Sequence, residues 1–115
     1  MKLNVFYLED HQFFSVDIIE YLSENHNVFY AKTYAEAEKL IEEHKNFDAS
    51  IIDVILQNGK TGIHFVTKYE GNLGNIMFLT GCVDQPTLDK LSKWEVASKR
   101  DVIWDKLDKL LEDAE

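Results

Sequence analysis

A short apolar run at residues 49–56, Ala-Ser-Ile-Ile-Asp-Val-Ile-Leu, is the feature that most constrains the fold. Strands covered on both faces show continuous Val, Ile and Leu instead of alternating apolar and polar residues, so the run predicts a fully buried strand. The single carboxylate in the run, Asp53, has two interpretations. It either starts the turn after the strand or lies at the rim of a sheet, where ligands of α/β folds bind.

The rest of the chain alternates between strand-like and helix-like segments. With a strand at 47–53, the pattern predicts further strands at 2–8, 28–31, 75–79 and 94–97, and helices at 12–24, 34–44, 62–69, 84–92 and from 101 onward. Thr33 and Glu36 fit a capping box at the start of the second helix. Five strand–helix units predict an α/β, flavodoxin-like fold, in which a parallel sheet has helices on both faces. The common strand order for such a sheet is 2-1-3-4-5.

Composition excludes several classes of function. The chain has 115 residues, a formal net charge of -9 and a pI near 4.8, so we expect no nucleic-acid partner, since no basic stripe is present to meet phosphates. The acidic balance is compatible with divalent cations and basic protein surfaces. A single cysteine allows no internal disulfide and no cysteine metal cluster. Without a signal-peptide pattern or an apolar run of membrane-spanning length, we expect a cytoplasmic protein with no membrane insertion.

Polar residues follow four of the predicted strands, and these residues are Glu9, Asp10, Asp53, Thr80, Gly81 and Lys99. In the order 2-1-3-4-5 the first and third strands are neighbours, so their three carboxylates should lie together. They would repel one another, and burial would disfavour their charges. A hard divalent cation, with Mg²⁺ as the natural candidate, would compensate.

The carboxylates divide between ligand and nucleophile roles. Asp10 and Asp53 could bind Mg²⁺ directly, Glu9 directly or through water, and the backbone carbonyl of Ile55 is a further candidate ligand. Asp53 could also be a nucleophile, because carboxylates form acyl phosphates and a metal ion screens the charge of the incoming phosphoryl group.

The neighbouring strand ends offer groups that suit phosphate oxygens. Thr80 has a hydroxyl, Gly81 has an unobstructed backbone amide, and Lys99 can make a charge-assisted hydrogen bond. Phosphoryl transfer mostly needs positioning and charge stabilisation, and these groups could supply both.

The order of these strand ends resembles the receiver domain of two-component response regulators, in its stand-alone, chemotaxis-regulator-like form. The shared pattern is an acidic pair after the first strand, Asp after the third, Thr and a small residue after the fourth, and Lys after the fifth. The resemblance covers almost the whole chain. It implies that Asp53 is the phosphoacceptor, that Glu9, Asp10 and Asp53 form the Mg²⁺ site, that Thr80 is the switch hydroxyl and that Lys99 contacts the phosphate.

The resemblance also implies the partners. A histidine kinase or a histidine phosphotransfer protein would donate the phosphoryl group, and an unknown downstream protein would read the changed surface. The five units use the whole chain, so we expect a single receiver-like domain at 1–115 without an effector domain. Such a protein is a signalling phosphoacceptor and not an enzyme, apart from its self-catalysed phosphoryl transfer and hydrolysis.

The loop after Asp53 departs from the family pattern. Family members often have Pro four residues after the acceptor and Gly eight after it, where this chain has Gln57 and Thr61. Gly62 comes nine residues after Asp53, which predicts a loop one residue longer. By the family pattern, Cys82 lies at the rim of the pocket, where an ordinary small residue is one interpretation. The alternative hypothesis is that Cys82 and Ile55 together limit water access and slow hydrolysis of the phosphoryl group.

The region around Lys99 departs as well. The family lysine is usually followed by Pro across a cis bond, and here Arg100 follows; a cis bond before a non-proline residue costs about 3 kcal/mol, so the turn should differ. Most members have Tyr or Phe three residues before the lysine, where this chain has Val96. Trp94 could substitute for that aromatic residue, and if it does not, the aromatic part of the switch is missing.

Two other functions remain open. A phosphorylation-independent interaction module would keep the fold with a vestigial switch. The departures from the family pattern after Asp53 and around Lys99 favour this function. A small Mg²⁺-dependent phosphatase would use Asp53 as nucleophile, but such enzymes usually need a carboxylate as general acid two residues later, where Ile55 stands.

Overall fold

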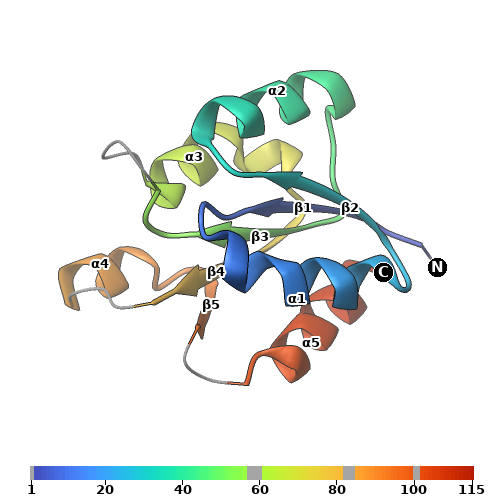
Figure 1. The fold of residues 1–115 in the computed structure, drawn as a ribbon. Helices are drawn as coiled ribbons and strands as arrows, with labels where there is room; N and C mark the ends of the chain where they lie inside the picture. The colour runs from blue at the N-terminus through green and yellow to red at the C-terminus, as the bar shows by residue number, and fades with distance from the viewer. Residues whose placement is uncertain (1, 57–60, 82–84, 100–101) are drawn as a thin grey trace.

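The computed structural model describes residues 2–56, 61–81, 85–99 and 102–115, without the side chains of residues 12–14 (Figure 1). The strands are β1 (Asn4–Leu8), β2 (Asn27–Ala31), β3 (Ala49–Asp53), β4 (Asn75–Thr80) and β5 (Glu95–Ser98). The helices are α1 (Gln12–Ser23), α2 (Tyr34–His44), α3 (Gly62–Tyr69), α4 (Gln85–Lys90) and α5 (Trp104–Ala114), with a short 3-10 helix, η2 (Glu70–Asn72).

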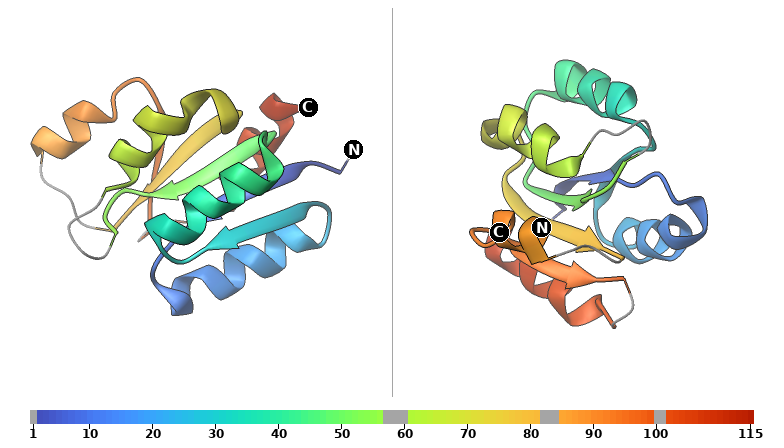
Figure 2. Two further views of the ribbon diagram at one scale, coloured as in Figure 1. Left: turned by 90° about the horizontal axis from the view of Figure 1, so that it is seen from above. Right: turned by 90° about the vertical axis from the view of Figure 1, so that its left-hand side faces the viewer.

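The five strands form one parallel sheet in the order β2-β1-β3-β4-β5, which confirms the predicted fold class. Helices α1 and α5 cover one face, and α2 and α3 cover the other (Figure 2). Because all strands run the same way, their carboxyl ends meet at one edge of the sheet. The residues that follow β1, β3, β4 and β5 therefore come together there.

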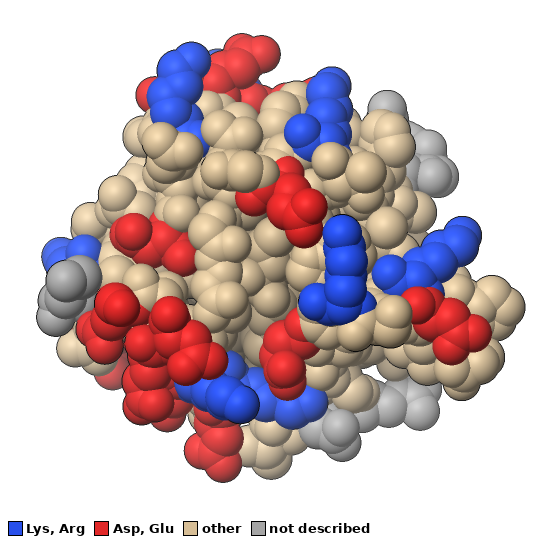
Figure 3. All heavy atoms as spheres, turned by 180° about the vertical axis from the view of Figure 1, so that it is seen from behind, with Lys and Arg blue, Asp and Glu red and all other residues tan. Residues whose placement is uncertain are grey.

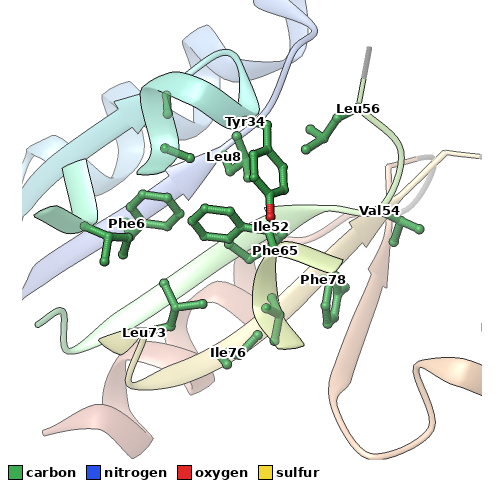
Figure 4. Close-up of a cluster of buried hydrophobic side chains, with 14 of the residues drawn as sticks. Phe6, Leu8, Tyr34, Ile52, Val54, Leu56, Phe65, Leu73, Ile76 and Phe78 are labelled. Atoms are coloured by element: carbon green, nitrogen blue, oxygen red, sulfur yellow. The ribbon is translucent and has the colours of Figure 1, made fainter. Parts of the chain in front are cut away.

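Two apolar layers hold the sheet between the helices. Phe6 and Ile52 point toward α3, where the ring of Phe6 stacks on that of Phe65 with 5.5 Å between centroids (Figure 4). Tyr7 and Ile51 point the opposite way, toward α1 and α5. Since successive residues of one strand alternate between two buried layers, every residue of β3 is buried. This explains the continuous apolar residues of β3, whereas Ile55 beyond the strand is exposed.

Most predicted elements agree with the structure to within two residues. The hydroxyl oxygen of Thr33 caps α2 by accepting a hydrogen bond from the backbone amide of Glu36 at 3.1 Å, as predicted. The fifth strand begins one residue later than predicted, so Trp94 precedes it. The fourth helix is shorter than predicted, and its predicted cap, Asp84, lies outside the described residues.

The start of the last helix was predicted too early. We expected a helix from Asp101, which lies outside the described residues, but α5 begins at Trp104. Val102 is 80% exposed and has no helical conformation, whereas Ile103 is buried at the position before the helix. The apolar spacing of Val102 and Ile103 fits a helix, but only Ile103 reaches the core.

Charged side chains of both signs are interspersed on the face of the molecule that Figure 3 shows. Within the described ranges, no helix has the length and apolar character that crossing a membrane requires.

Candidate functional site

The candidate site lies at the carboxyl edge of the sheet, on the side covered by α1 and α5. Ile51 of β3 and Ala97 of β5 are buried on that side. Two residues further along each strand, the alternation of side chains puts Asp53 and Lys99 on the same side. Glu9 continues β1 in the same way, since its backbone amide donates to Ala31 of β2 at 3.1 Å. The strand register therefore brings these three charged residues together.

Lys99 joins the two buried carboxylates. Its Nζ lies 2.7 Å from Oε1 of Glu9 and 3.3 Å from Oδ2 of Asp53. The Glu9 side chain is completely buried, and that of Lys99 is 17% exposed. The backbone amide of His11 also donates to Oε1 of Glu9 at 3.2 Å. One oxygen of Glu9 is thus held from two directions.

Three carboxylates at this edge could hold a metal ion. Glu9, Asp10 and Asp53 each offer one oxygen, and these oxygens lie within 4.8 Å of one another. Oε2 of Glu9 is buried and has no hydrogen-bond partner among the described residues. Carboxylate oxygens are the ligands that hard divalent cations prefer. The three residues therefore fit a cation such as Mg²⁺.

Burial changes the acidity of the site. It raises the pKa of Asp53 to about 7; the negative charge of Glu9 adds to this effect, and the positive charge of Lys99 opposes it. Burial also raises the pKa of Glu9, against the hydrogen bond from Lys99. One lysine does not balance the two buried carboxylates, so burial shifts Glu9 and Asp53 toward their protonated forms.

A hollow of about 330 Å³ opens beside the carboxylates. Its lining residues are Asp10, His11, Asp53, Val54, Ile55, Thr80, Gly81 and Lys99. Oγ1 of Thr80 is buried and has no hydrogen-bond partner among the residues that the structure describes. The hollow thus combines an unused hydroxyl, an ammonium group and carboxylates, which is a suitable set for a phosphoryl group.

Backbone contacts join the two ends of the loop between β3 and α3. Ile55 and Thr61 form an isolated antiparallel bridge, and the amide of Gly62 donates to the carbonyl of Val54 at 2.8 Å. A Cβ atom on Gly62 would lie 2.0 Å from the carbonyl oxygen of Asp53, so only glycine allows α3 to start this close to β3. The predicted longer loop includes residues 57–60, which lie outside the described residues.

The structure gives Trp94 a different position from the one that the substitution hypothesis needs. Its ring packs edge-on against Phe78 at 5.3 Å, and its indole nitrogen donates to Glu70 at 3.2 Å. These contacts hold Trp94 at the amino end of β5, and it does not line the hollow at the carboxyl end. Val96, three residues before Lys99, is half-buried. Arg100 and Cys82 lie outside the described residues.

A second hollow, of about 370 Å³, lies at the opposite end of β4 and β5, against α5. Lysines and carboxylates both line it, and several of its charges already have partners. Lys93 pairs with Glu70 at 3.8 Å, and Lys106 donates to the carbonyl of Val96 at 2.9 Å. Although this hollow is slightly larger, the unpartnered buried oxygens of Glu9 and Thr80 make the smaller one the better candidate.

One contact at the site was missed by sequence reasoning. The hydroxyl of Tyr30, on β2, donates to the backbone carbonyl of Glu9 at 2.7 Å and so holds the turn after β1. The contact depends on the register of β1 and β2, which pairs Tyr7 with Tyr30. No local pattern in the sequence indicates that register.

Comparison with known proteins gives a fold and no closer relationship. No family model matches the chain, and no curated protein matches it. Among solved structures, it is similar to a CheY-like response regulator receiver domain protein from Methanospirillum hungatei, with 18% identity and a TM-score of 0.84 over 99% of this chain and 94% of that chain. A response regulator receiver domain protein from Clostridium thermocellum gives 19% identity and a TM-score of 0.82, over 96% and 92% of the two chains.

A third similar structure is a response regulator protein from Burkholderia pseudomallei with a phosphorylated aspartic acid, calcium ion and citrate. It has 22% identity and a TM-score of 0.81, over 99% of this chain and 69% of that chain. At these identities the comparison establishes the fold alone. The chain therefore has the fold of response regulator receiver domains.

Proposed function

We propose that this chain is a receiver domain that accepts a phosphoryl group on Asp53. The observation that carries the proposal is the contact of one lysine, Lys99, with two buried carboxylates beside the unpartnered hydroxyl of Thr80. The receiver fold found in the comparisons supports it. The phosphoryl donor would be a phosphohistidine on a histidine kinase or a histidine phosphotransfer protein.

In the proposed step, an oxygen of the Asp53 carboxylate forms a bond to phosphorus. The bond between phosphorus and the donor histidine breaks, and the imidazole nitrogen keeps the electron pair and takes up a proton. Lys99 offsets the added negative charge, and the Thr80 hydroxyl and Gly81 amide donate to phosphoryl oxygens. A divalent cation held by Glu9, Asp10 and Asp53, and by the carbonyl of Ile55, would screen the charge of the incoming group.

The output would be a changed protein-interaction surface. The Thr80 hydroxyl would turn toward the phosphoryl group, and the surface around β5 and the neighbouring helices would change. A downstream protein that binds this surface would read the change, as part of two-component signalling in the cytoplasm. The chain would act as a phosphoacceptor and not as an enzyme with turnover.

Intact mass spectrometry tests the proposal. The protein is incubated with Mg²⁺ and acetyl phosphate or phosphoramidate, beside Asp53→Asn and metal-free samples. We expect one added phosphoryl group, lost in the variant and without metal. Absence of the adduct with every donor, in protein shown to be folded, would overturn the proposal.

A second candidate function is a phosphorylation-independent interaction module. It is favoured by Val96, which is half-buried at the position where most receivers have an aromatic residue, and by the location of Trp94 away from the hollow. Binding of a downstream protein with and without beryllium fluoride, which mimics an acyl phosphate, distinguishes the two. Equal affinities in both conditions favour the second candidate.

A further inference from the structure

Tyr7 lies on β1, two residues before Glu9 of the acidic site. It is completely buried on β1, where its register partners are Tyr30 of β2 and Ile51 of β3. The same layer contains many fully buried apolar side chains, and they include those of Val5, Leu22, Ile51, Met77, Leu79 and Leu107. The ring of a phenylalanine would meet the same apolar surroundings, so the hydroxyl needs a separate explanation.

The hydroxyl of Tyr7 has no hydrogen-bond partner within the described part of the chain. Tyr30 does not supply one, although its ring centroid is 5.4 Å away; its hydroxyl donates to the carbonyl of Glu9 and makes no hydrogen bond to that of Tyr7. A buried hydroxyl without a partner destabilises the folded state, and such groups are rare in proteins. The feature therefore points to a partner that is not a protein atom of this layer.

An unused acceptor on the same side of the sheet belongs to the acidic site. Glu9 follows Tyr7 by two residues and continues the strand, so the two side chains lie on the same side of the sheet. Oε2 of Glu9 is buried and also without a partner. Burial, followed by the electrostatic effect of Glu9, Tyr30 and Asp53, raises the pKa of the Tyr7 hydroxyl, which therefore remains a neutral donor. The Tyr7 hydroxyl is thus a donor and Oε2 of Glu9 an acceptor, two residues apart along β1, and neither has a hydrogen-bond partner among the described residues.

We propose that Tyr7 is a positioning residue of the acidic site, and that its hydroxyl donates to Oε2 of Glu9 through one internal water molecule. The two oxygens make no direct hydrogen bond, and a single buried water typically joins such pairs of unsatisfied groups. A carboxylate oxygen has two lone pairs, so Oε2 can accept from this water and still bind a cation. Lys99 and the His11 amide hold Oε1, and the Tyr7 connection fixes Oε2.

The proposal rests on the proposed function in one respect, namely that Glu9 helps to hold a divalent cation. Partners that hydrogen-bond to metal ligands orient those ligands, and their loss typically weakens metal binding about 10- to 100-fold. Tyr7→Phe removes only the hydroxyl and keeps the ring. We therefore expect its Mg²⁺ dissociation constant, measured by titration calorimetry, to rise about tenfold.

Tyr34→Phe is the matched control. Tyr34 is buried on the opposite face of the sheet, where its hydroxyl and Nδ1 of His64 are 2.9 Å apart. Loss of that contact should lower the melting temperature without changing Mg²⁺ affinity. A weaker Mg²⁺ affinity in Tyr7→Phe and an unchanged Mg²⁺ affinity in Tyr34→Phe would separate positioning of the site from a general effect on packing.

A crystal structure of the wild-type protein tests the connection itself. We expect one ordered water within about 3 Å of both Oη of Tyr7 and Oε2 of Glu9. Absence of that water, or an unchanged Mg²⁺ affinity in Tyr7→Phe when the wild type binds Mg²⁺, would overturn the proposal. Failure of the wild type to bind Mg²⁺ would instead count against the metal site of the proposed function, and the crystal structure would still decide the role of Tyr7.

Discussion

Lys99 and Glu9 are separated by 90 positions in the chain and form an ion pair of 2.7 Å, in which the carboxylate is completely buried. A buried charge that loses its partner costs more than the pair contributes. The same ammonium lies 3.3 Å from Asp53, so one side chain stabilises two carboxylates. Much of the electrostatic balance of the site therefore depends on Lys99.

Replacing Lys99 should destabilise the protein. In Lys99→Met we expect a loss of about 3 kcal/mol in the free energy of unfolding at pH 8, measured by urea denaturation, because two buried carboxylates lose their counter-charge. The loss should be smaller at pH 5, where protonation removes much of the repulsion. Lys93→Met is the control, since the pair between Lys93 and Glu70 is exposed and should change stability by less than about 1 kcal/mol. Equal losses in the two variants would contradict this account of the site.

Neutralising Asp53 should have the opposite effect. Its pKa is about 7 in the folded protein and near 3.8 when unfolded, so between these values the folded state binds more protons. Stability then falls as the pH rises from about 4 to 7. In metal-free buffer, Asp53→Asn should therefore raise the melting temperature at pH 8 by at least about 4 °C, with little effect at pH 4. Asp17→Asn, at an exposed position on α1, is the matched control. A stabilisation that is the same at both pH values would refute the raised pKa.

Magnesium should stabilise the protein in a pH-dependent manner. At about 100 times its dissociation constant, a ligand of the folded state adds about 2.7 kcal/mol. The cation must displace the proton of Asp53, whose pKa is about 7, so the rise in melting temperature should be larger at pH 8 than at pH 6. Chelation with EDTA should reverse it. Asp10→Asn should remove most of the rise, and a variant that retains the full shift would exclude Asp10 as a ligand.

Gly62 should be essential to the geometry around Asp53. A Cβ atom at this position would meet the Asp53 carbonyl oxygen at 2.0 Å, and backbone must move to relieve the clash. We expect Gly62→Ala to lose at least about 2 kcal/mol of stability and to accept the phosphoryl group more slowly. Gly71→Ala is the matched control, because a Cβ there would meet nothing within 4 Å. Normal phosphorylation of a stable Gly62→Ala would show that the close approach is unimportant.

Ile55 should slow hydrolysis of the phosphoryl group. Its side chain is 56% exposed at the rim of the hollow and offers no hydrogen bond to an attacking water. Ile55→Asn should shorten the lifetime of the phosphorylated protein several-fold, as followed by intact mass after removal of the donor. Val102→Asn, at an exposed apolar position that does not line the hollow, should leave the lifetime unchanged. An equal lifetime in Ile55→Asn and the wild type would exclude this role.

Local patterns predicted the elements well and the last helix poorly. Periodicity identified α3 at its observed bounds, and the apolar run identified β3. Both predictions succeeded because burial of one or both faces of an element determines which positions in the sequence are apolar. Val102 and Ile103 have helical spacing, yet α5 begins only at Trp104. The start of a helix depends on where the preceding loop brings the chain back to the core. The spacing of apolar residues does not contain that information.

For the candidate site too, some features could be predicted from the sequence and others only from the tertiary structure. The sequence by itself determined which residue types end the strands, since an acidic pair, Asp53, Thr80 and Lys99 can be read in order. Only the tertiary structure decided that Lys99 contacts Glu9 more closely than Asp53, that Trp94 packs on Phe78 away from the hollow, and that Tyr7 of β1 lies beside β3. These contacts join residues from separate strands, and their distances follow from strand register and packing, which no local pattern encodes.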